Sequence, residues 1–181
     1  MYLNNINMSN EFETNTKQLV DTFFIKYFDL KESDDMILKI MKREVDNLFN
    51  KHRLVYVNML TKIMTMNIEV EIFVKEIVEN IFSDGLINWG RIISLITFGI
   101  LIVDYLKMIN MTDKIKTVSF IISSYLIEHQ KQWLLENNAW TGLVDFFTVQ
   151  DHTSHIKSPL TLFIALISIG ALLYSTFNLA H

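Results

Sequence analysis

Apolar residues recur along this chain at the spacing of helical faces. One stripe is formed by Leu19, Phe23, Tyr27 and Leu30. Another is formed by Val70, Val74, Ile77 and Ile81. Residues three or four apart share one face of an α-helix, so both segments are predicted to be amphipathic helices. Ser33-Asp34-Asp35 and Thr112-Asp113 are helix-start signals, and each precedes a further amphipathic segment.

Residues 92–103 have a different pattern, because they are apolar on every face of a helix. This segment is too short to cross a bilayer, which takes about 20 residues. A helix that is apolar all round and lies between amphipathic helices is expected to form the buried centre of a bundle. Asn88 stands where an N-cap belongs, and Asp104 ends the apolar run.

The C-terminal region contains an uncharged apolar run, residues 160–180, that is long enough for one transmembrane helix. Pro159 precedes it, and a helix start tolerates proline well. We therefore expect a helical domain over residues 1–149, a polar linker over 150–158 and a C-terminal membrane anchor over 159–181. His152 and His155 are expected to be solvated linker residues. The alternative for the apolar run is a buried terminal helix of a globular domain.

The composition favours an all-α protein and argues against several functions. Half of the residues are hydrophobic and 20% are charged, which is unlike a disordered chain. One Pro and five Gly leave few helix breakers. The net charge of -4 gives no basic surface for nucleic acid. The chain has no Cys and no GxSxG, HExxH or phosphate-binding Gly-rich motif, so we expect no enzyme, no metal and no cofactor.

Two motifs resemble those of a known family. The first is Asn88-Trp89-Gly90-Arg91, followed by an apolar helix that contains Phe98-Gly99. The second has the sequence WLLENNAW from Trp133 to Trp140 and continues with Val144-Asp145-Phe146-Phe147. In this order, they resemble the first and second homology motifs of the B-cell lymphoma-two (Bcl) family of apoptosis regulators.

Other segments match that family less closely. Residues 16–27 are similar to its N-terminal amphipathic helix. Its third motif, the death motif, would fall at residues 41–46, where Met41 replaces Leu and Val45 replaces a small residue. Leu86 is an extra residue between Asp84-Gly85 and Asn88, just ahead of the first motif.

The resemblance implies a bundle of about eight helices around a buried central hydrophobic helix. It also implies a surface groove that binds the amphipathic death-motif helix of pro-apoptotic family members. Such a groove needs apolar pockets and a polar group that fixes the register of the ligand. At its exposed rim, Gly90 would let a partner backbone approach, Arg91 would bind a ligand carboxylate, and Asn88 would add a hydrogen bond. By motif alignment, the groove would be lined by Leu48, His52, Val55, Tyr56, Met59, Ile77, Ile81, Ser94, Phe98 and Phe147.

These residues also fit roles inside the molecule. For Ile77, Ile81 and Phe98, core and groove are equally good interpretations. Arg91 has an alternative as an internal ion pair with Asp84 or Glu136.

The tryptophans and one glycine are expected to be structural. Trp89, Trp133 and Trp140 should pack the junction of the two motifs, and Gly142 should permit close packing in the last short helix.

The leading hypothesis is a pro-survival protein, tail-anchored in the mitochondrial outer membrane or the endoplasmic reticulum. It would sequester death-motif helices and so block permeabilisation of the outer membrane. The compact chain and the degenerate third motif suggest a viral homologue, from a large DNA virus such as a poxvirus. The alternatives are a pro-apoptotic pore-forming member, which would need a competent third motif, and a membrane-tethered helical scaffold. The sequence leaves homodimerisation open.

Overall fold

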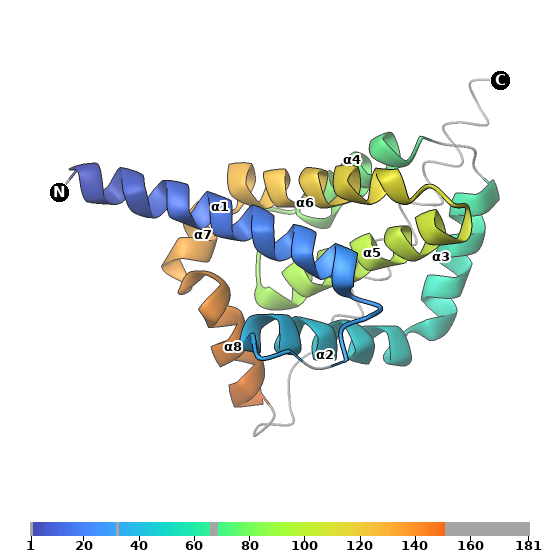
Figure 1. Ribbon diagram of the computed structural model, residues 1–181, viewed down its shortest axis with the longest axis horizontal. Helices are drawn as coiled ribbons and strands as arrows, with labels where there is room; N and C mark the ends of the chain where they lie inside the picture. Colours follow the sequence, from blue (N-terminus) through green and yellow to red (C-terminus); the bar gives the residue numbers. More distant parts are fainter. Residues whose placement is uncertain (1, 32, 66–68, 151–181) are drawn as a thin grey trace.

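The computed structural model describes residues 2–31, 33–65 and 69–150, and these form a bundle of helices (Figure 1). The α-helices in this part are α1 (Tyr2–Lys26), α2 (Met36–Lys51), α3 (Arg53–Thr65), α4 (Val70–Ile81), α5 (Trp89–Met108), α6 (Ile115–His129), α7 (Lys131–Glu136) and α8 (Ala139–Gln150). A short 3-10 helix, η1 (Thr112–Lys114), precedes α6. The predicted all-α fold is confirmed. Residues 151–181, with nearly all of the predicted linker and the whole predicted anchor, lie outside the described residues.

Helix α5 is the centre of the bundle, as the apolar pattern of residues 92–103 predicts. Figure 1 shows it between α2 on one side and α4 and α6 on the other. Every residue from 91 to 103 is buried. Among the described residues, α5 is long and apolar enough to cross a membrane. Most of it is enclosed by the bundle, however, and the core helix of a folded domain can have the same length and composition.

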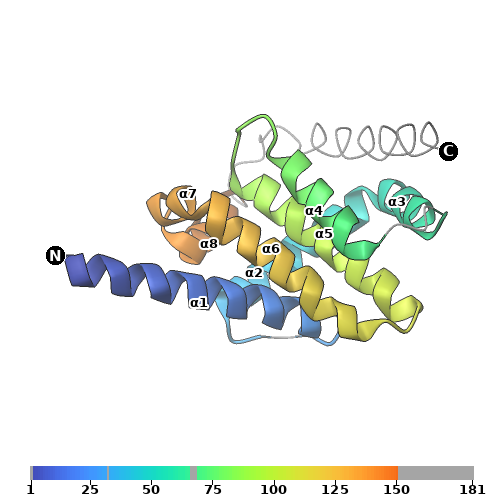
Figure 2. The same ribbon diagram turned by 90° about the horizontal axis from the view of Figure 1, so that it is seen from above.

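The amphipathic helices pack their apolar stripes against this centre. In α1 the buried apolar residues are Phe12, Val20, Phe23 and Phe24, and in α4 they are Phe73, Val74, Ile77, Val78 and Ile81. Figure 2 shows α1 beside α6, and the buried Ser119 hydroxyl of α6 donates to Asp21 Oδ1 of α1 at 2.8 Å. Helix α1 begins at Tyr2, well before the segment 16–27 that the sequence identifies. Lys131 Nζ binds Glu13 Oε1 at 2.5 Å and so ties this polar extension to α7.

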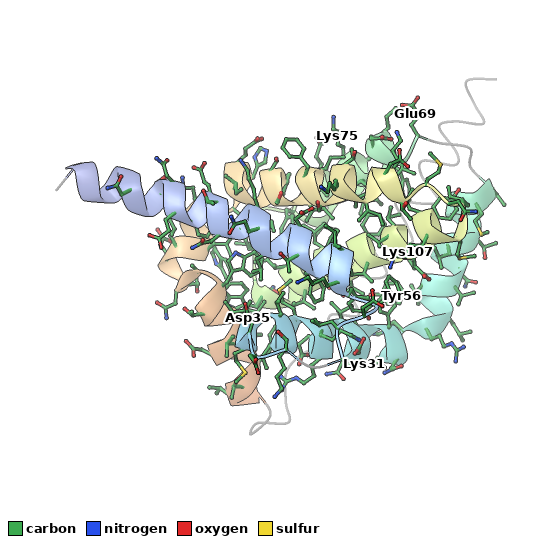
Figure 3. All side chains as sticks on the ribbon, viewed as in Figure 1. Lys31, Asp35, Tyr56, Glu69, Lys75 and Lys107 are labelled. Carbon is green, nitrogen blue, oxygen red and sulfur yellow. The ribbon has the colours of Figure 1, made fainter. Side chains whose placement is uncertain are left out.

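Helix starts lie near the predicted positions. Asp35 caps α2, because its Oδ1 accepts hydrogen bonds from the backbone N–H groups of Ile37 (2.8 Å) and Leu38 (3.3 Å) (Figure 3). Asn88 caps α5 through its Oδ1, which accepts from the backbone N–H of Arg91 at 2.9 Å. Thr112-Asp113 opens the 3-10 turn η1 rather than an α-helix, and α6 follows from Ile115.

The two tryptophan motifs meet at one junction, as predicted. The ring of Trp89 lies 5.1 Å from that of Trp133 and 6.2 Å from that of Trp140, measured between centroids. Both Trp89 and Trp140 are buried. Gly142 lies against the backbone carbonyl of Asn137, where a Cβ atom would clash. The tryptophans and Gly142 therefore join the start of α5 to α7 and α8.

Candidate functional site

The guanidinium of Arg91 lies at the N-terminal end of α5, inside a set of acceptors from its own chain. Nη2 donates to Asp84 Oδ2 at 2.6 Å, and Nη1 donates to Asp84 Oδ1. Nη1 also donates to the carbonyl oxygens of Ile81 (3.0 Å) and Leu86 (3.1 Å). The two Nη atoms thus bind one carboxylate in a bidentate fork, the geometry in which Arg and carboxylate interact most strongly.

The loop between α4 and α5 is shaped to bring these acceptors together. Asp84 Oδ1 accepts a hydrogen bond from the backbone N–H of Leu86 at 3.0 Å. Gly85, between them, has a φ of 72°, a left-handed conformation that glycine adopts without strain. The turn aims the Leu86 carbonyl at Arg91 and leaves the Leu86 side chain exposed. Leu86, the extra residue ahead of the first motif, therefore serves Arg91 through its backbone.

The predicted exposure of Arg91 at the rim of a groove is wrong. Its side chain is only 10% exposed, whereas that of Asp84 is 50% exposed and lies at the surface. The internal pair with Asp84, one of the alternatives for Arg91, is the one that the structure contains, and Glu136 is not its partner. The hydrogen bonds from Arg91 and then from the Leu86 backbone lower the pKa of the Asp84 carboxyl to about 2. The carboxylate is therefore charged at neutral pH.

Gly90 differs from Gly99 and Gly142, where the packing inside the bundle leaves no room for a side chain. A Cβ at Gly99 would meet the Phe24 ring and, at 2.8 Å, Ile122 Cδ1, and one at Gly142 would meet backbone. Around Gly90 the one nearby atom among the described residues is Asn88 Oδ1, 3.1 Å from the position that a Cβ would take. Gly90 is half-buried, so the absence of a side chain there leaves a backbone surface that a second chain can approach.

The predicted groove residues are distributed over five helices and the junction between two of them. Leu48 lies in α2, His52 between α2 and α3, Val55, Tyr56 and Met59 in α3, Ile77 and Ile81 in α4, Ser94 and Phe98 in α5, and Phe147 in α8. Val55 is half-buried, and the other described side chains of this set are buried. The side chain of Met59 lies outside the described part of the chain. Ile77, Ile81 and Phe98 belong to the hydrophobic core, and their role in ligand binding stays a prediction.

Several contacts bring these helices together. The Tyr56 ring lies 4.7 Å from that of Phe49 and joins α3 to α2 (Figure 3). The Phe98 ring lies 5.8 Å from that of Phe73 and joins α5 to α4. Arg43 Nη2 of α2 donates to the backbone carbonyl of Phe147 in α8 at 3.2 Å. These contacts join α3 and α8 to α2, and α4 to α5.

Burial changes the titration of two polar residues in this set. It lowers the pKa of His52, and the neighbouring Lys51 ammonium lowers it further. It also raises the pKa of the Tyr56 hydroxyl well above its usual range. Both side chains are therefore expected to be neutral at pH 7.

The sequence did not reveal two acceptors of the Arg91 site. The carbonyl groups of Ile81 and Leu86 carry no signal in the sequence, because any residue supplies a carbonyl. Asp84 does have a signal in the sequence, because an Asp followed by Gly just before a helix favours a turn that the carboxylate stabilises.

The protein is thus a helical bundle around a central apolar helix, and an Asn-Trp-Gly-Arg motif stands at the start of that helix. Residues 41–140 match the family described as "Apoptosis regulator proteins, Bcl-2 family". This match covers more than half of the chain, and the chain belongs to the Bcl-2 family of apoptosis regulators.

Individual relatives agree with this assignment. The chain is 33% identical over 76 residues to Bcl-2-related protein A1 of Bos taurus, which is 40% of this chain and 43% of that protein. It is 31% identical over 74 residues to Bcl-2-like protein 1 of Rattus norvegicus, covering 40% and 31% of the two chains. The chain thus matches less than half of the length of these curated relatives.

Solved structures agree on the fold. A crystal structure of the zebrafish pro-survival protein NRZ in complex with Bad BH3 superimposes with a TM-score of 0.70 and 20% identity, covering 78% of this chain and 98% of that chain. NRZ without ligand superimposes with a TM-score of 0.67 and 20% identity, covering 78% and 96%.

Proposed function

We propose that this chain is a pro-survival member of the family that binds the amphipathic death-motif helix of pro-apoptotic proteins. The ligand would lie across the N-terminal end of α5, between the walls formed by α2, α3, α4 and α8. The fold neighbour NRZ, a pro-survival protein whose structure contains Bad BH3, supports this proposal. A viral origin, from a large DNA virus, stays a prediction from the sequence.

The proposal rests on Gly90, which has no side chain, and on the adjacent Arg91, whose side chain is held in one position by hydrogen bonds. Packing inside the described residues does not require a glycine there. A helical ligand needs close backbone approach together with a polar group that sets its register. Gly90 supplies the first and Arg91 the second, one residue apart on the same turn of α5.

Membrane attachment is part of the proposal. The apolar run 160–180 would anchor the chain in the mitochondrial outer membrane with the helical domain in the cytosol. Removal of residues 159–181 should release the protein from the membrane fraction of cells into the supernatant. Recovery of the shortened protein in the membrane fraction, resistant to alkaline extraction, would contradict the anchor. Organelle markers in the same fractions distinguish mitochondria from endoplasmic reticulum.

The function itself is tested on isolated mitochondria. The full-length protein is added together with a peptide that activates the pro-apoptotic members, and release of intermembrane proteins is measured. The proposal predicts that release is suppressed. Increased release would instead indicate a pro-apoptotic, pore-forming member, and no change together with no peptide binding would indicate a scaffold.

A further inference from the structure

The ion pair between Arg91 and Asp84 affects how a ligand would bind in the proposed groove. The Nη1–Nη2 edge of the guanidinium is one of the two edges that a ligand carboxylate can use for a bidentate contact. In this structure Asp84 occupies that edge with both of its carboxylate oxygens. A ligand carboxylate therefore meets a guanidinium whose charge is already balanced.

Position and exposure place Asp84 on the outside of this pair. Its side chain is half exposed, and the Arg91 side chain lies almost fully buried behind it. Asp84 belongs to the loop between α4 and α5, whereas Arg91 belongs to the first turn of the rigid central helix. The carboxylate can thus move away more easily than the guanidinium.

Arg91 does not depend on Asp84 alone for its position. The carbonyl groups of Ile81 and Leu86 also hold Nη1, at 3.0 and 3.1 Å. These two neutral acceptors would keep the guanidinium in place when the carboxylate is gone. Asp84 therefore contributes mainly charge at the Nη edge and less to orientation.

We propose that Asp84 is a specificity-determining residue, which competes with a ligand carboxylate for Arg91 and so weakens the preference of the groove for acidic helices. This inference rests on the function proposed above. A helix that carries an Asp opposite Arg91 must displace Asp84 or bind beside a like charge. A helix with a neutral residue at that position meets neither cost.

The matched variant is Asp84→Asn. The Asn amide oxygen can still accept from the Leu86 N–H, as Asp84 Oδ1 does now. The amide nitrogen cannot accept a hydrogen bond from Arg91, and the negative charge is lost. Asp113→Asn, in the exposed turn η1 beyond the other end of α5, makes the same charge change away from the site and serves as the control.

The test measures the affinity of the full-length protein for two death-motif peptides, one with Asp and one with Asn opposite Arg91. Removal of the competing negative charge should tighten binding of the Asp peptide on the order of tenfold. Binding of the Asn peptide should be unchanged in Asp84→Asn, and Asp113→Asn should change neither. Equal affinities of Asp84→Asn and wild type for the Asp peptide, or weaker binding by the variant, would overturn the inference and leave the proposed function intact. No binding of either peptide by wild type would overturn both.

A second measurement uses the unaltered protein and therefore does not depend on the folding of a variant. The pKa of the Asp84 carboxyl is followed by NMR with and without the bound Asp peptide. Displacement from Arg91 predicts a rise of this pKa from about 2 toward the ordinary range when the peptide binds. An unchanged pKa in the complex would overturn the inference.

Discussion

The indole Nε1 of Trp140 donates a hydrogen bond to Thr16 Oγ1 at 3.0 Å, and both residues are buried. This bond joins α8, which carries the second motif, to α1. A buried indole N–H that loses its acceptor costs about 1–3 kcal/mol. The substitution Thr16→Val removes the acceptor and keeps the shape of the side chain, so we expect a loss of that size in the free energy of unfolding. Denaturant unfolding measures it.

Thr14→Val is the matched control for this prediction. Thr14 is an exposed threonine of the same helix, whose hydroxyl donates to the Asn10 carbonyl within α1. Its replacement should leave the stability almost unchanged. Equal losses in the two variants would show that the Trp140–Thr16 bond contributes nothing specific.

A second prediction concerns the glycines of α5. In Gly99→Ala the new methyl group meets the Phe24 ring and Ile122. Overpacking of this kind typically costs about 1–3 kcal/mol, which thermal or denaturant unfolding would detect. A fully stable Gly99→Ala protein would contradict the close packing of α1, α5 and α6.

Gly90→Ala should affect binding more than stability. The methyl group would lie 3.1 Å from the cap oxygen of Asn88, which must shift slightly. Alanine favours a helix over glycine by roughly 0.5–1 kcal/mol. Because these two effects oppose each other, stability should change little. The affinity for a death-motif peptide should fall, by about tenfold, because the partner backbone can no longer approach. Unchanged affinity in a folded Gly90→Ala protein would count against the proposed ligand position.

A third prediction concerns the acid titration of Asp84. The folded pKa of this group lies below its unfolded value, so its ion pair with Arg91 stabilises the fold fully above the unfolded pKa of about 3.9. This stabilisation is lost as the pH falls from about 4 to about 2. NMR of the carboxyl carbon should give a pKa of about 2 in the wild type. In Arg91→Ala the pKa should rise toward the ordinary range, with the Leu86 backbone hydrogen bond still lowering it in part, and an unchanged low value there would contradict the pairing.

Much of the fold can be predicted from the sequence, because the spacing of apolar residues within each helix indicates which of its faces are buried. Residues 92–103 are apolar on all sides, and such a helix has no stable place except the centre of a bundle. The junction of Trp89, Trp133 and Trp140 follows from two motifs that can bury their large rings only against one another. The helical state of residues 2–15 is harder to predict, since these residues are mostly polar and Lys131 of α7 binds Glu13 in this segment from far along the chain.

The candidate site is less predictable than the fold. The sequence identifies Arg91 but does not decide between an internal and an external carboxylate. That choice depends on the backbone of the loop before α5, where Gly85 turns the chain and Leu86 directs its carbonyl at the guanidinium. Burial is likewise a property of the whole bundle, and so the sequence alone could not separate core from groove at Ile77, Ile81 and Phe98.

We propose that Arg91 binds the carboxylate of a death-motif helix. The most direct test is a double-mutant cycle between Arg91→Ala in the full-length protein and Asp→Ala in the peptide, with the dissociation constant measured for all four pairs. The two changes should be coupled by about tenfold or more, because each removes the same interaction. The cycle cancels any general loss of affinity that Arg91→Ala causes by releasing Asp84. Strictly additive effects, with peptide binding otherwise intact, would contradict the claim.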